Sequence, residues 1–434
     1  MSAASQARRL RPDLEIVAFE RSSYVSYAAC GEPYYVGGLV DSLDDLVART
    51  PQEFAARNIE VHVRHEVVEI NLDSRHVTIN SLDEGGTSRV GFDQLMYSTG
   101  SRPLRPDDIT GIDDPDVFGL RTLEDAERLK IRADQGPGQV VIVGGGYIGI
   151  EVAEMLVDRG WQVTMVTSGQ HVLERTLDPH MGNLGDQAVR DHGVELVTGS
   201  RVTAIEQRGT RFYVSGESYD SKADLVVIGL GAGPEVGLAL DAGIPLGITG
   251  AVAVDERQET GIGGVWSGGD CAEARHRING EPVNILLGTV ANKTGRIAGT
   301  NLAGGDQRFP GVLGTAITKI GATEIARTGF KVIHAEAAGF TPIVGIAEGT
   351  TTAGYWPSAA PVTVMVVADE SSGRLLGAQV VGGPGAGKRI DVFATAIWTG
   401  LTAAELAWLD LAYAPPFSGV WDIIHIAARR AAGS

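Results

Sequence analysis

One cysteine near the start of the chain, Cys30, stands alone among small and aromatic residues. The only other cysteine among the 434 residues is Cys271. Because a neighbouring pair would close a local disulfide, an isolated thiol instead predicts redox chemistry at one sulfur atom. The alternative is a small buried hydrophobic residue, which is the common fate of free cysteine. Gly31 and Pro33 favour a helix that begins at Cys30, and a helix start or a nearby positive charge would stabilise the reactive thiolate.

Three glycines, Gly144, Gly146 and Gly149, have the spacing of a dinucleotide-binding turn. A strand is expected before them, from residue 139, and a helix after them, reaching residue 156. The first glycine permits a tight turn, the second lets the backbone approach a pyrophosphate, and the third allows close packing of helix on strand. Free N–H groups at the helix start favour the phosphates. The sequence therefore predicts a dinucleotide site here.

The residue that selects between NAD and NADP is expected just after the next strand, at residues 162–166. An acid there would bind the ribose hydroxyl of NAD, whereas a nearby arginine would favour NADP. The chain has Thr167 at this position, with His171 and Arg175 as the closest basic residues. The choice between NADH and NADPH therefore stays open.

The size and composition of the chain limit its class. A chain of 434 residues is too long for one hydrophobic core and predicts two or three domains. Its net charge of −18 argues against nucleic acid and anionic membrane surfaces as partners. No apolar run has the length needed to span a bilayer. Two cysteines cannot form a disulfide framework, so we expect a cytoplasmic protein.

The order of the elements is typical of repeated strand–helix units. Residues 1–10 favour a helix, which leads into a strand at residues 14–19 followed by Glu20. A helix that feeds a strand ending in an acid is the second half of a dinucleotide-binding unit. We expect the first strand and glycine-rich turn of that unit to precede Met1, so that this unit is incomplete in the chain. Further strands are expected at 59–63, 67–72, 76–79, 94–98, 225–229, 362–367 and 376–381, and helices at 391–399 and 403–409.

Four more motifs follow in order along the chain, at residues 267–271, 287–293, 388–391 and 412–417. Together with the Cys30 segment and the glycine-rich turn, they resemble the pyridine nucleotide-disulfide oxidoreductases over essentially the whole chain. The single-cysteine branch of that family, which holds coenzyme A-disulfide reductases, NADH oxidases and peroxidases, and persulfide reductases, is the most similar.

The resemblance implies an α/β fold with two nucleotide-binding Rossmann-like domains, the first truncated at its N-terminus, and a C-terminal α+β dimerisation domain. The implied boundaries are 1–112 with 241–308 for the FAD-binding domain, 113–240 for the NAD(P)H-binding domain, and 309–434 for the dimerisation domain. A cytoplasmic homodimer is therefore expected.

The same resemblance implies roles for single residues. Hydride would pass from NAD(P)H to FAD, and electrons would then reach Cys30. Glu20 would bind the FAD ribose and Asp270 the ribityl chain or its phosphate. Tyr147 would lie against the flavin and Glu151 near its edge, although Glu151 also suits an ordinary first helical turn. The other implied cofactor-binding residues are Arg21, Gly100, Gly144, Gly146, Ile148, Gly149, Thr167 and Phe417.

The substrate side of the site is implied in the same way. Tyr355 and Tyr413 would lie near the sulfur, contributed by the partner subunit, or would pack the dimer interface. Four positions match those that hold coenzyme A in relatives, namely Ser2, Gln6, Arg9 and Ser26. The chain departs from the family pattern at Ala29, Val290 and Trp421, and the last two remove cations that would hold coenzyme A.

These implications predict an FAD-dependent NAD(P)H oxidoreductase that reduces a small disulfide or persulfide through Cys30, with coenzyme A as the candidate thiol. One alternative is an NAD(P)H oxidase that passes electrons to oxygen. Another is a flavin-poor nucleotide-binding remnant. Because the first dinucleotide unit is expected to be incomplete, we expect this chain to retain flavin poorly and to turn over slowly.

Overall fold

The nucleotide-binding turn predicted after residue 139 forms as a β-α-β unit in the computed structural model, which describes residues 1–433. Strand β9 (Gln139–Val143) pairs in parallel with β10 (Gln162–Val166) and with β15 (Leu225–Ile228). Helix α5 (Tyr147–Asp158) connects β9 to β10. All four apolar residues of β9 are buried, as expected for a parallel strand covered on both faces.

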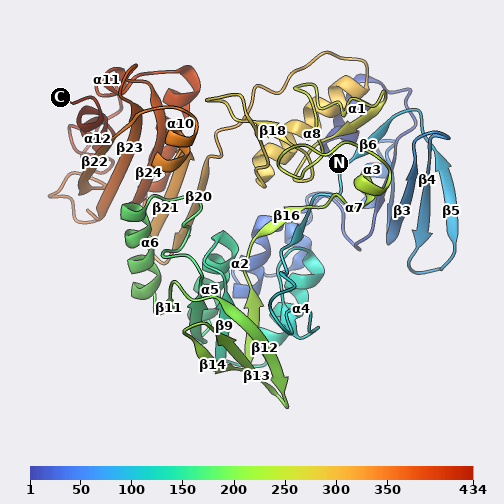
Figure 1. The fold of residues 1–434 in the computed structure, drawn as a ribbon, viewed down its shortest axis with the longest axis horizontal. Helices are drawn as coiled ribbons and strands as arrows, with labels where there is room; N and C mark the ends of the chain where they lie inside the picture. The colour runs from blue at the N-terminus through green and yellow to red at the C-terminus, as the bar shows by residue number, and fades with distance from the viewer. Residues whose placement is uncertain (434) are drawn as a thin grey trace.

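This unit is the centre of a five-stranded parallel sheet with the order β11-β10-β9-β15-β8. A three-stranded antiparallel sheet, β12-β13-β14, lies beside it in the lower part of Figure 1. The other elements of this region are β8 (Val117–Phe118), α4 (Leu123–Asp134), α6 (Pro179–Asp191), β11 (Glu195–Val197), β12 (Val202–Arg208), β13 (Arg211–Gly216) and β14 (Asp220–Ala223).

The chain returns to the N-terminal region after residue 231. Most of this region lies at the upper right of Figure 1, while α2 lies below it and packs on α5 and α4. Its first half contains α1 (Ser2–Leu10), β1 (Val17–Glu20), η1 (Ala29–Gly31), α2 (Glu32–Gly37), η2 (Leu43–Leu46), α3 (Pro51–Ala55), β2 (Glu60–Val63), β3 (His65–Asn71), β4 (His76–Ser81), β5 (Thr87–Gly91), β6 (Leu95–Tyr97) and β7 (Ser101–Pro103). Its second half contains β16 (Ala232–Pro234), α7 (Gly237–Asp241), β17 (Val265–Ser267), β18 (Ala274–Arg275), β19 (Pro282–Val283) and α8 (Gly288–Leu302).

Short sheets build this N-terminal region. Strand β1 pairs in parallel with β2 alone, β6 pairs in parallel with β17, and β3-β4-β5 form an antiparallel sheet. The strand predicted from residue 14 begins only at Val17, because the Leu14 N–H is bonded to the Arg11 carbonyl in a turn. Strand β5 was not predicted, since it is exposed along nearly its whole length and lacks an apolar alternation.

The C-terminal region is a five-stranded antiparallel sheet with the order β20-β21-β24-β23-β22, shown in orange and red in Figure 1. Helix α12 (Ile423–Ala431) packs on β22 and β23, and α10 (Ile390–Thr399) packs on β24 and β21. The remaining elements are β20 (Ala316–Ile320), β21 (Thr323–Gly329), α9 (Val332–Ala337), β22 (Pro342–Thr350), β23 (Pro361–Asp369), β24 (Leu375–Gly382), η3 (Gly387–Arg389) and α11 (Ala403–Leu406).

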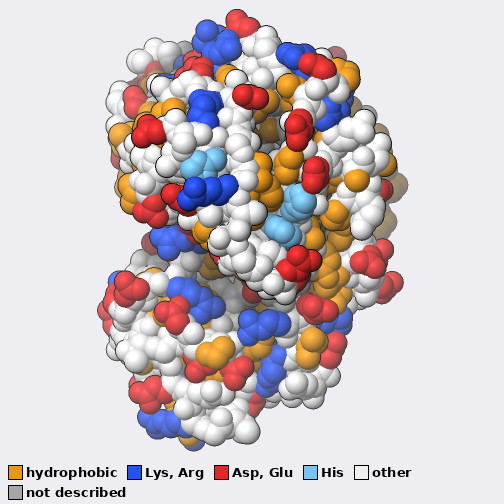
Figure 2. Space-filling view, turned by 90° about the vertical axis from the view of Figure 1, so that its right-hand side faces the viewer, with side chains coloured by type: hydrophobic (Ala, Val, Ile, Leu, Met, Phe, Trp, Pro, Cys, Tyr) orange, Lys and Arg blue, Asp and Glu red, His pale blue; other side chains and the backbone are white. Residues whose placement is uncertain are grey.

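Charged side chains of both signs are interspersed on the face of the molecule shown in Figure 2. This face carries no broad basic surface of the kind that binds nucleic acid. Among residues 1–433, the structure contains no helix that is long and apolar enough to cross a membrane.

Helix α1 is held against α8 by close backbone contact, and this contact generates a stability prediction. A Cβ atom at Gly299 of α8 would lie 2.3 Å from the Ala3 carbonyl oxygen and 2.7 Å from the Ala3 Cα. Since the obstacle is backbone, the substitution Gly299→Ala must move α1, and we expect a loss of about 1–3 kcal/mol of stability. Thermal and urea unfolding of the purified chain measure this loss.

The matched control is Gly288→Ala on the same helix, where a Cβ atom would meet nothing within 4 Å. We expect this control to leave the unfolding midpoint unchanged or slightly raised. Equal midpoints for the two variants would show that the α1–α8 contact is not tight.

Candidate active site

Cys30 lies in the turn η1, immediately before α2. Its side chain is exposed, which excludes the buried hydrophobic alternative. The turn is tight, because the Gly31 N–H donates to the Ala28 carbonyl at 2.9 Å. A Cβ atom at Gly31 would lie 2.2 Å from Leu46 Cδ2, so a glycine after the cysteine lets η1 pack on η2. The predicted helix start at Cys30 is therefore a short 3₁₀ turn that leads into α2.

The electrostatic surroundings of the Cys30 thiol differ from the expectation. Neighbouring protein desolvates the sulfur, and the negative charges of Glu151, Glu32 and Asp270 act in the same direction, so that the pKa of Cys30 is raised. The helix start expected at Cys30 is present as η1 and α2, but the charges that act on the thiol are negative rather than positive. The resting thiol is therefore protonated at neutral pH.

Glu151 is brought to Cys30 by α5, where Tyr147, Glu151, Glu154 and Asp158 follow one stripe of the helix. Burial raises the pKa of the Glu151 carboxyl to about 7. The Thr318 hydroxyl of β20 opposes this shift by donating to Glu151 Oε1 at 3.1 Å. The sequence did not predict Thr318, because 167 positions separate it from Glu151.

Glu32 is a second group that sequence reasoning missed. Its side chain is only 2% exposed, and its Oε1 atom has no hydrogen-bond partner. Burial raises the pKa of this carboxyl to about 8, and the positive charge of Arg121 opposes the shift. Acids are common in the first turn of a helix, so nothing in the sequence selects Glu32. Its burial, which only the structure shows, sets it apart from an ordinary first-turn acid. Cys30 is thus flanked by two carboxyls that hold protons near neutral pH.

The glycine-rich turn at α5 has the geometry that a dinucleotide requires. Cβ atoms at Gly144 and Gly149 would each lie 2.3 Å from a backbone carbonyl oxygen, so both positions need glycine for packing. A Cβ at Gly146 would meet nothing closer than 3.7 Å. Gly146 is also the N-cap of α5 and no side chain caps it. The free N–H groups at this helix start, including that of Ile148, therefore fit a pyrophosphate.

Of the residues expected to select between NADH and NADPH, some already form hydrogen bonds within the protein. His171 Nδ1 lies 2.9 Å from Asp186 Oδ2, and Asp186 Oδ1 also accepts the Val172 N–H. His171 is thus held inside the fold, whereas Arg175 is exposed. Thr167 Oγ1 accepts the Gly169 N–H at 3.3 Å. Of the two predicted basic candidates, only Arg175 is free to move towards a ligand.

The residues predicted to hold FAD lie at the ends of strands in the N-terminal region. Glu20 ends β1, and one of its oxygens accepts the Ser22 N–H at 2.8 Å. Asp270 follows β17, and one of its oxygens accepts the Ser101 hydroxyl at 3.0 Å. Both carboxylates are half-buried, and among the described residues the other oxygen of each has no hydrogen-bond donor, so this pair of acceptors fits the hydroxyl groups of FAD. Gly100 adopts a positive φ of 75°, and Arg21 forms an ion pair with Glu66 at 3.5 Å.

Some of the side chains expected to hold coenzyme A already form hydrogen bonds within the protein. Gln6 is buried and donates to Thr300 Oγ1 at 3.1 Å, and Ser2 donates to Asn292 Oδ1 at 2.7 Å. Arg9 is exposed, with one donor on Gln6 at 2.6 Å. Ser26 adopts a positive φ of 55°, and its carbonyl accepts two backbone N–H groups. Arg9 is therefore the cation of this set that can reach a phosphate.

The two predicted tyrosines and Phe417 lie on the C-terminal region and are strongly exposed, with Tyr355 at 76%, Tyr413 at 47% and Phe417 at 73%. Arg389 connects the two segments that carry these rings, because its guanidinium group donates to the carbonyls of Thr351 and Phe417 and forms an ion pair with Asp422. In the single chain these rings face solvent, and their roles remain predictions.

The carboxylates around Cys30 generate a prediction about the reactivity of its thiol. Replacement Glu151→Gln removes a negative charge, so the pKa of Cys30 should fall and more thiolate should be present at a given pH. We expect the rate of iodoacetamide alkylation at pH 8.5 to rise by about two- to fivefold. Because the Glu151 carboxyl titrates at about 7, the increase should be smaller at pH 6, where that carboxyl is already neutral.

The control is Glu127→Gln, an exposed acid on α4 that does not act on the thiol. Peptide mapping assigns the alkylation to Cys30, since Cys271 is buried. An unchanged or lower rate in Glu151→Gln at pH 8.5 would show that Glu151 does not act on the sulfur.

Known proteins resemble this chain over its full length. The family model for pyridine nucleotide-disulphide oxidoreductases matches residues 1–295, and the model for the dimerisation domain of these enzymes matches residues 315–423. An NAD(P)H coenzyme A polysulfide/persulfide reductase from Pyrococcus horikoshii is 36% identical, covering 99% of this chain and 95% of its own. An NADH oxidase from Methanocaldococcus jannaschii is 33% identical, covering 99% and 96%.

A solved structure extends these matches to three dimensions. The NAD-dependent persulfide reductase from A. fulgidus aligns with a TM-score of 0.95 and 36% identity, over 99% of this chain and 80% of that one. Both sequence and fold therefore agree with the resemblance drawn from the motifs. The chain belongs to the pyridine nucleotide-disulphide oxidoreductase family.

Proposed function

We propose that this enzyme uses NAD(P)H and FAD to reduce a small disulfide or persulfide, with Cys30 as its only redox sulfur. The observation that carries the proposal is the contrast between the two cysteines. Cys30 is exposed beside Glu151 and Asp270, whereas Cys271 is fully buried, with its sulfur 3.7 Å from Ser267 Oγ. Only one thiol can therefore meet a substrate.

The cofactors of the family, FAD and NAD(P)H, supply a hydride and deliver two electrons to sulfur when they are bound. The N-terminal end of α5 would hold the nicotinamide dinucleotide by its pyrophosphate. Glu20 and Asp270 would accept hydroxyl groups of FAD. Tyr147 lies on the first turn of α5, on the stripe that also carries Glu151.

Cys30 would act in two steps. Its thiolate attacks one sulfur of the substrate disulfide, so that a mixed disulfide forms and one thiolate leaves. Two electrons then cleave the mixed disulfide, which restores the Cys30 thiolate and releases the second thiolate. Each leaving thiolate takes up one proton. The Glu151 and Glu32 carboxyls hold protons near neutral pH, and in their neutral forms they no longer repel the thiolate.

A homodimer would complete the substrate side of the site. The presence of a dimerisation domain supports a dimer. Large apolar side chains are exposed on the surface of the C-terminal region. Such a surface is typical of one that a second copy of the chain covers in a dimer. They are Tyr355, Trp408, Tyr413, Phe417, Val420 and Trp421. In such a dimer, the tyrosine hydroxyls would donate hydrogen bonds to a thiolate on the partner subunit.

The second candidate activity is an NADH oxidase, because a relative similar over the full length bears that name. The two activities differ in their need for the Cys30 thiol. Reduction of a disulfide requires it, whereas direct passage of electrons to oxygen with release of peroxide does not.

The replacement Cys30→Ser separates these activities. We expect NAD(P)H-dependent reduction of coenzyme A disulfide, followed as thiol release, to fall by at least about a thousandfold, because serine cannot form the mixed disulfide. Oxygen consumption and peroxide release should persist in the same variant. Flavin content is measured in parallel, so that loss of cofactor is not taken for loss of chemistry.

The matched control is Cys271→Ala, which removes the buried thiol and should retain thiol release. Thiol release that persists in flavin-loaded Cys30→Ser would contradict the proposal. Thiol release absent from the parent enzyme, with sustained oxygen consumption, would favour the oxidase.

A further inference from the structure

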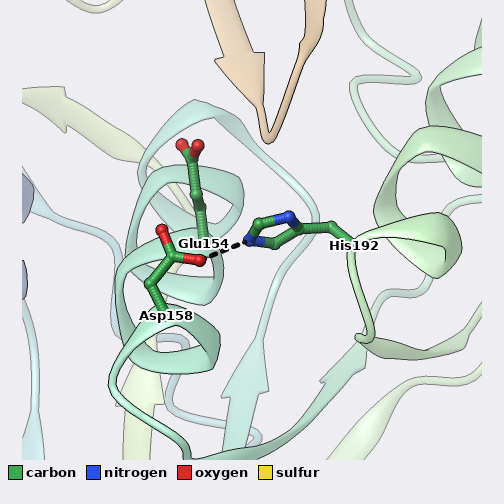
Figure 3. Close-up of side chains that lie close together, drawn as sticks. All are labelled: Glu154, Asp158 and His192. Carbon is green, nitrogen blue, oxygen red and sulfur yellow. Dashed lines mark ion pairs between the residues drawn. The ribbon is translucent and has the colours of Figure 1, made fainter.

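A second group of chemically active side chains lies away from Cys30, where the nucleotide-binding sheet meets the C-terminal region. Glu154 and Asp158 project from the last two turns of α5, and His192 is the C-cap of α6 (Figure 3). One ligand atom from each of these residues lies within 4.8 Å of the other two. Two carboxylates and an imidazole form a donor set that binds divalent transition-metal ions.

Two buried atoms of this cluster lack hydrogen-bond partners. Glu154 is 1% exposed and its Oε2 atom has no partner, although such an atom normally costs free energy when it is left unpaired. His192 Nε2 also has no hydrogen bond and lies 3.3 Å from Asp158 Oδ1, the ion pair drawn in Figure 3. A cation between the three side chains would satisfy both atoms together.

The other oxygen of Glu154 is already fixed. Glu154 Oε1 accepts the Gly321 N–H at 2.9 Å and forms an ion pair with the Lys319 ammonium group. These contacts orient the carboxylate from outside and leave Oε2 for a ligand, as is usual around metal sites. Among residues 1–433, Lys319 is the one lysine or arginine that forms an ion pair with the cluster, against two carboxylates, so the cluster keeps an excess of negative charge.

The β20–β21 turn closes one side of the cluster. Gly321 has a positive φ of 57°, and a Cβ atom there would lie 2.8 Å from His192 Nδ1. Glycine at this position therefore lets the turn approach the imidazole ring. Three elements meet at the cluster, namely the end of α5, the end of α6 and the turn that begins the C-terminal sheet.

We propose that Glu154, Asp158 and His192 bind one divalent transition-metal ion of the zinc class. Zinc holds nitrogen and oxygen ligands at about 2.0–2.2 Å, which places neighbouring ligand atoms about 3.4 Å apart in a tetrahedron. Atoms that lie within 4.8 Å of one another need to close by at most about 1.4 Å to reach that spacing, and Asp158, being exposed, has room to move. A water molecule would fill the fourth position.

The bound ion would link α5 and α6 directly and, through Glu154, the turn before β21. The ion would therefore stabilise the contact between the nucleotide-binding sheet and the C-terminal region. This site is separate from the redox site, since the carboxylates that act on Cys30 are Glu151, Glu32 and Asp270 and none of them belongs to the cluster.

Direct titration tests this site. Full-length protein with Cys30→Ser, which removes the exposed thiol as a competing ligand, is freed of metal with EDTA, desalted and titrated with Zn²⁺ by calorimetry. Co²⁺ absorption then reports on the ligand set. We expect one Zn²⁺ per chain and an unfolding midpoint that rises with Zn²⁺ concentration.

Added in this background, His192→Ala and Asp158→Asn should each weaken Zn²⁺ binding by at least about tenfold and abolish the shift in midpoint. His180→Ala is the matched control, because His180 is an exposed histidine on the same helix α6. It should bind as the parent does. Absence of Zn²⁺ binding by the parent, or equal affinities in all four proteins, would overturn the proposal.

Discussion

The close approach of α5 to the strand that precedes it is the constraint on which the rest of this structure depends. A Cβ atom at Gly149 would meet the Gly144 carbonyl oxygen at 2.3 Å and drive the helix off the sheet, and one at Gly144 would meet the Gly229 carbonyl oxygen after β15 at 2.3 Å. With the helix fixed in this way, its free N-terminal N–H groups lie at the glycine-rich turn, where the phosphates of a dinucleotide would bind. The same fixed axis decides where every side chain on α5 lies.

One stripe of α5 then connects the different parts of the molecule. Tyr147 and Glu151 lie at the start, where the dinucleotide turn, Cys30 and β20 come together. Glu154 contacts Lys319 and Gly321 one turn later. The helix therefore joins the nucleotide-binding sheet to the C-terminal sheet through buried carboxylates. Burial makes the Glu151 carboxyl costly to ionise, and so its protonation is sensitive to what binds nearby.

Local patterns in the sequence were enough to predict some of this arrangement. The strand, turn and helix around Gly144, Gly146 and Gly149 formed as predicted, because each step depends on residues within one short segment. The exposed position of Cys30 agrees with a reactive thiol, and the order of motifs predicted the family correctly. The roles of single residues and the domain boundaries remain predictions.

Long-range contacts account for what the sequence did not predict. Thr318 reaches Glu151 and Lys319 reaches Glu154 across more than a third of the chain, and no local pattern marks such pairs. The acids that raise the pKa of Cys30 come from three separate segments, so no local pattern indicated that the charges around the thiol are negative. Gln6, proposed as a ligand contact, is buried against α8 because α1 packs unusually closely there.

The central claim is that electrons from NAD(P)H reach substrate through the sulfur of Cys30. Intact-mass analysis of the flavin-loaded enzyme tests it most directly. The enzyme is treated with coenzyme A disulfide under anaerobic conditions, desalted, and then reduced with NADH or NADPH. We predict one coenzyme A adduct per chain, mapped to Cys30, that the reduced nicotinamide removes. An adduct that does not form, that maps elsewhere, or that persists after reduction would contradict this account.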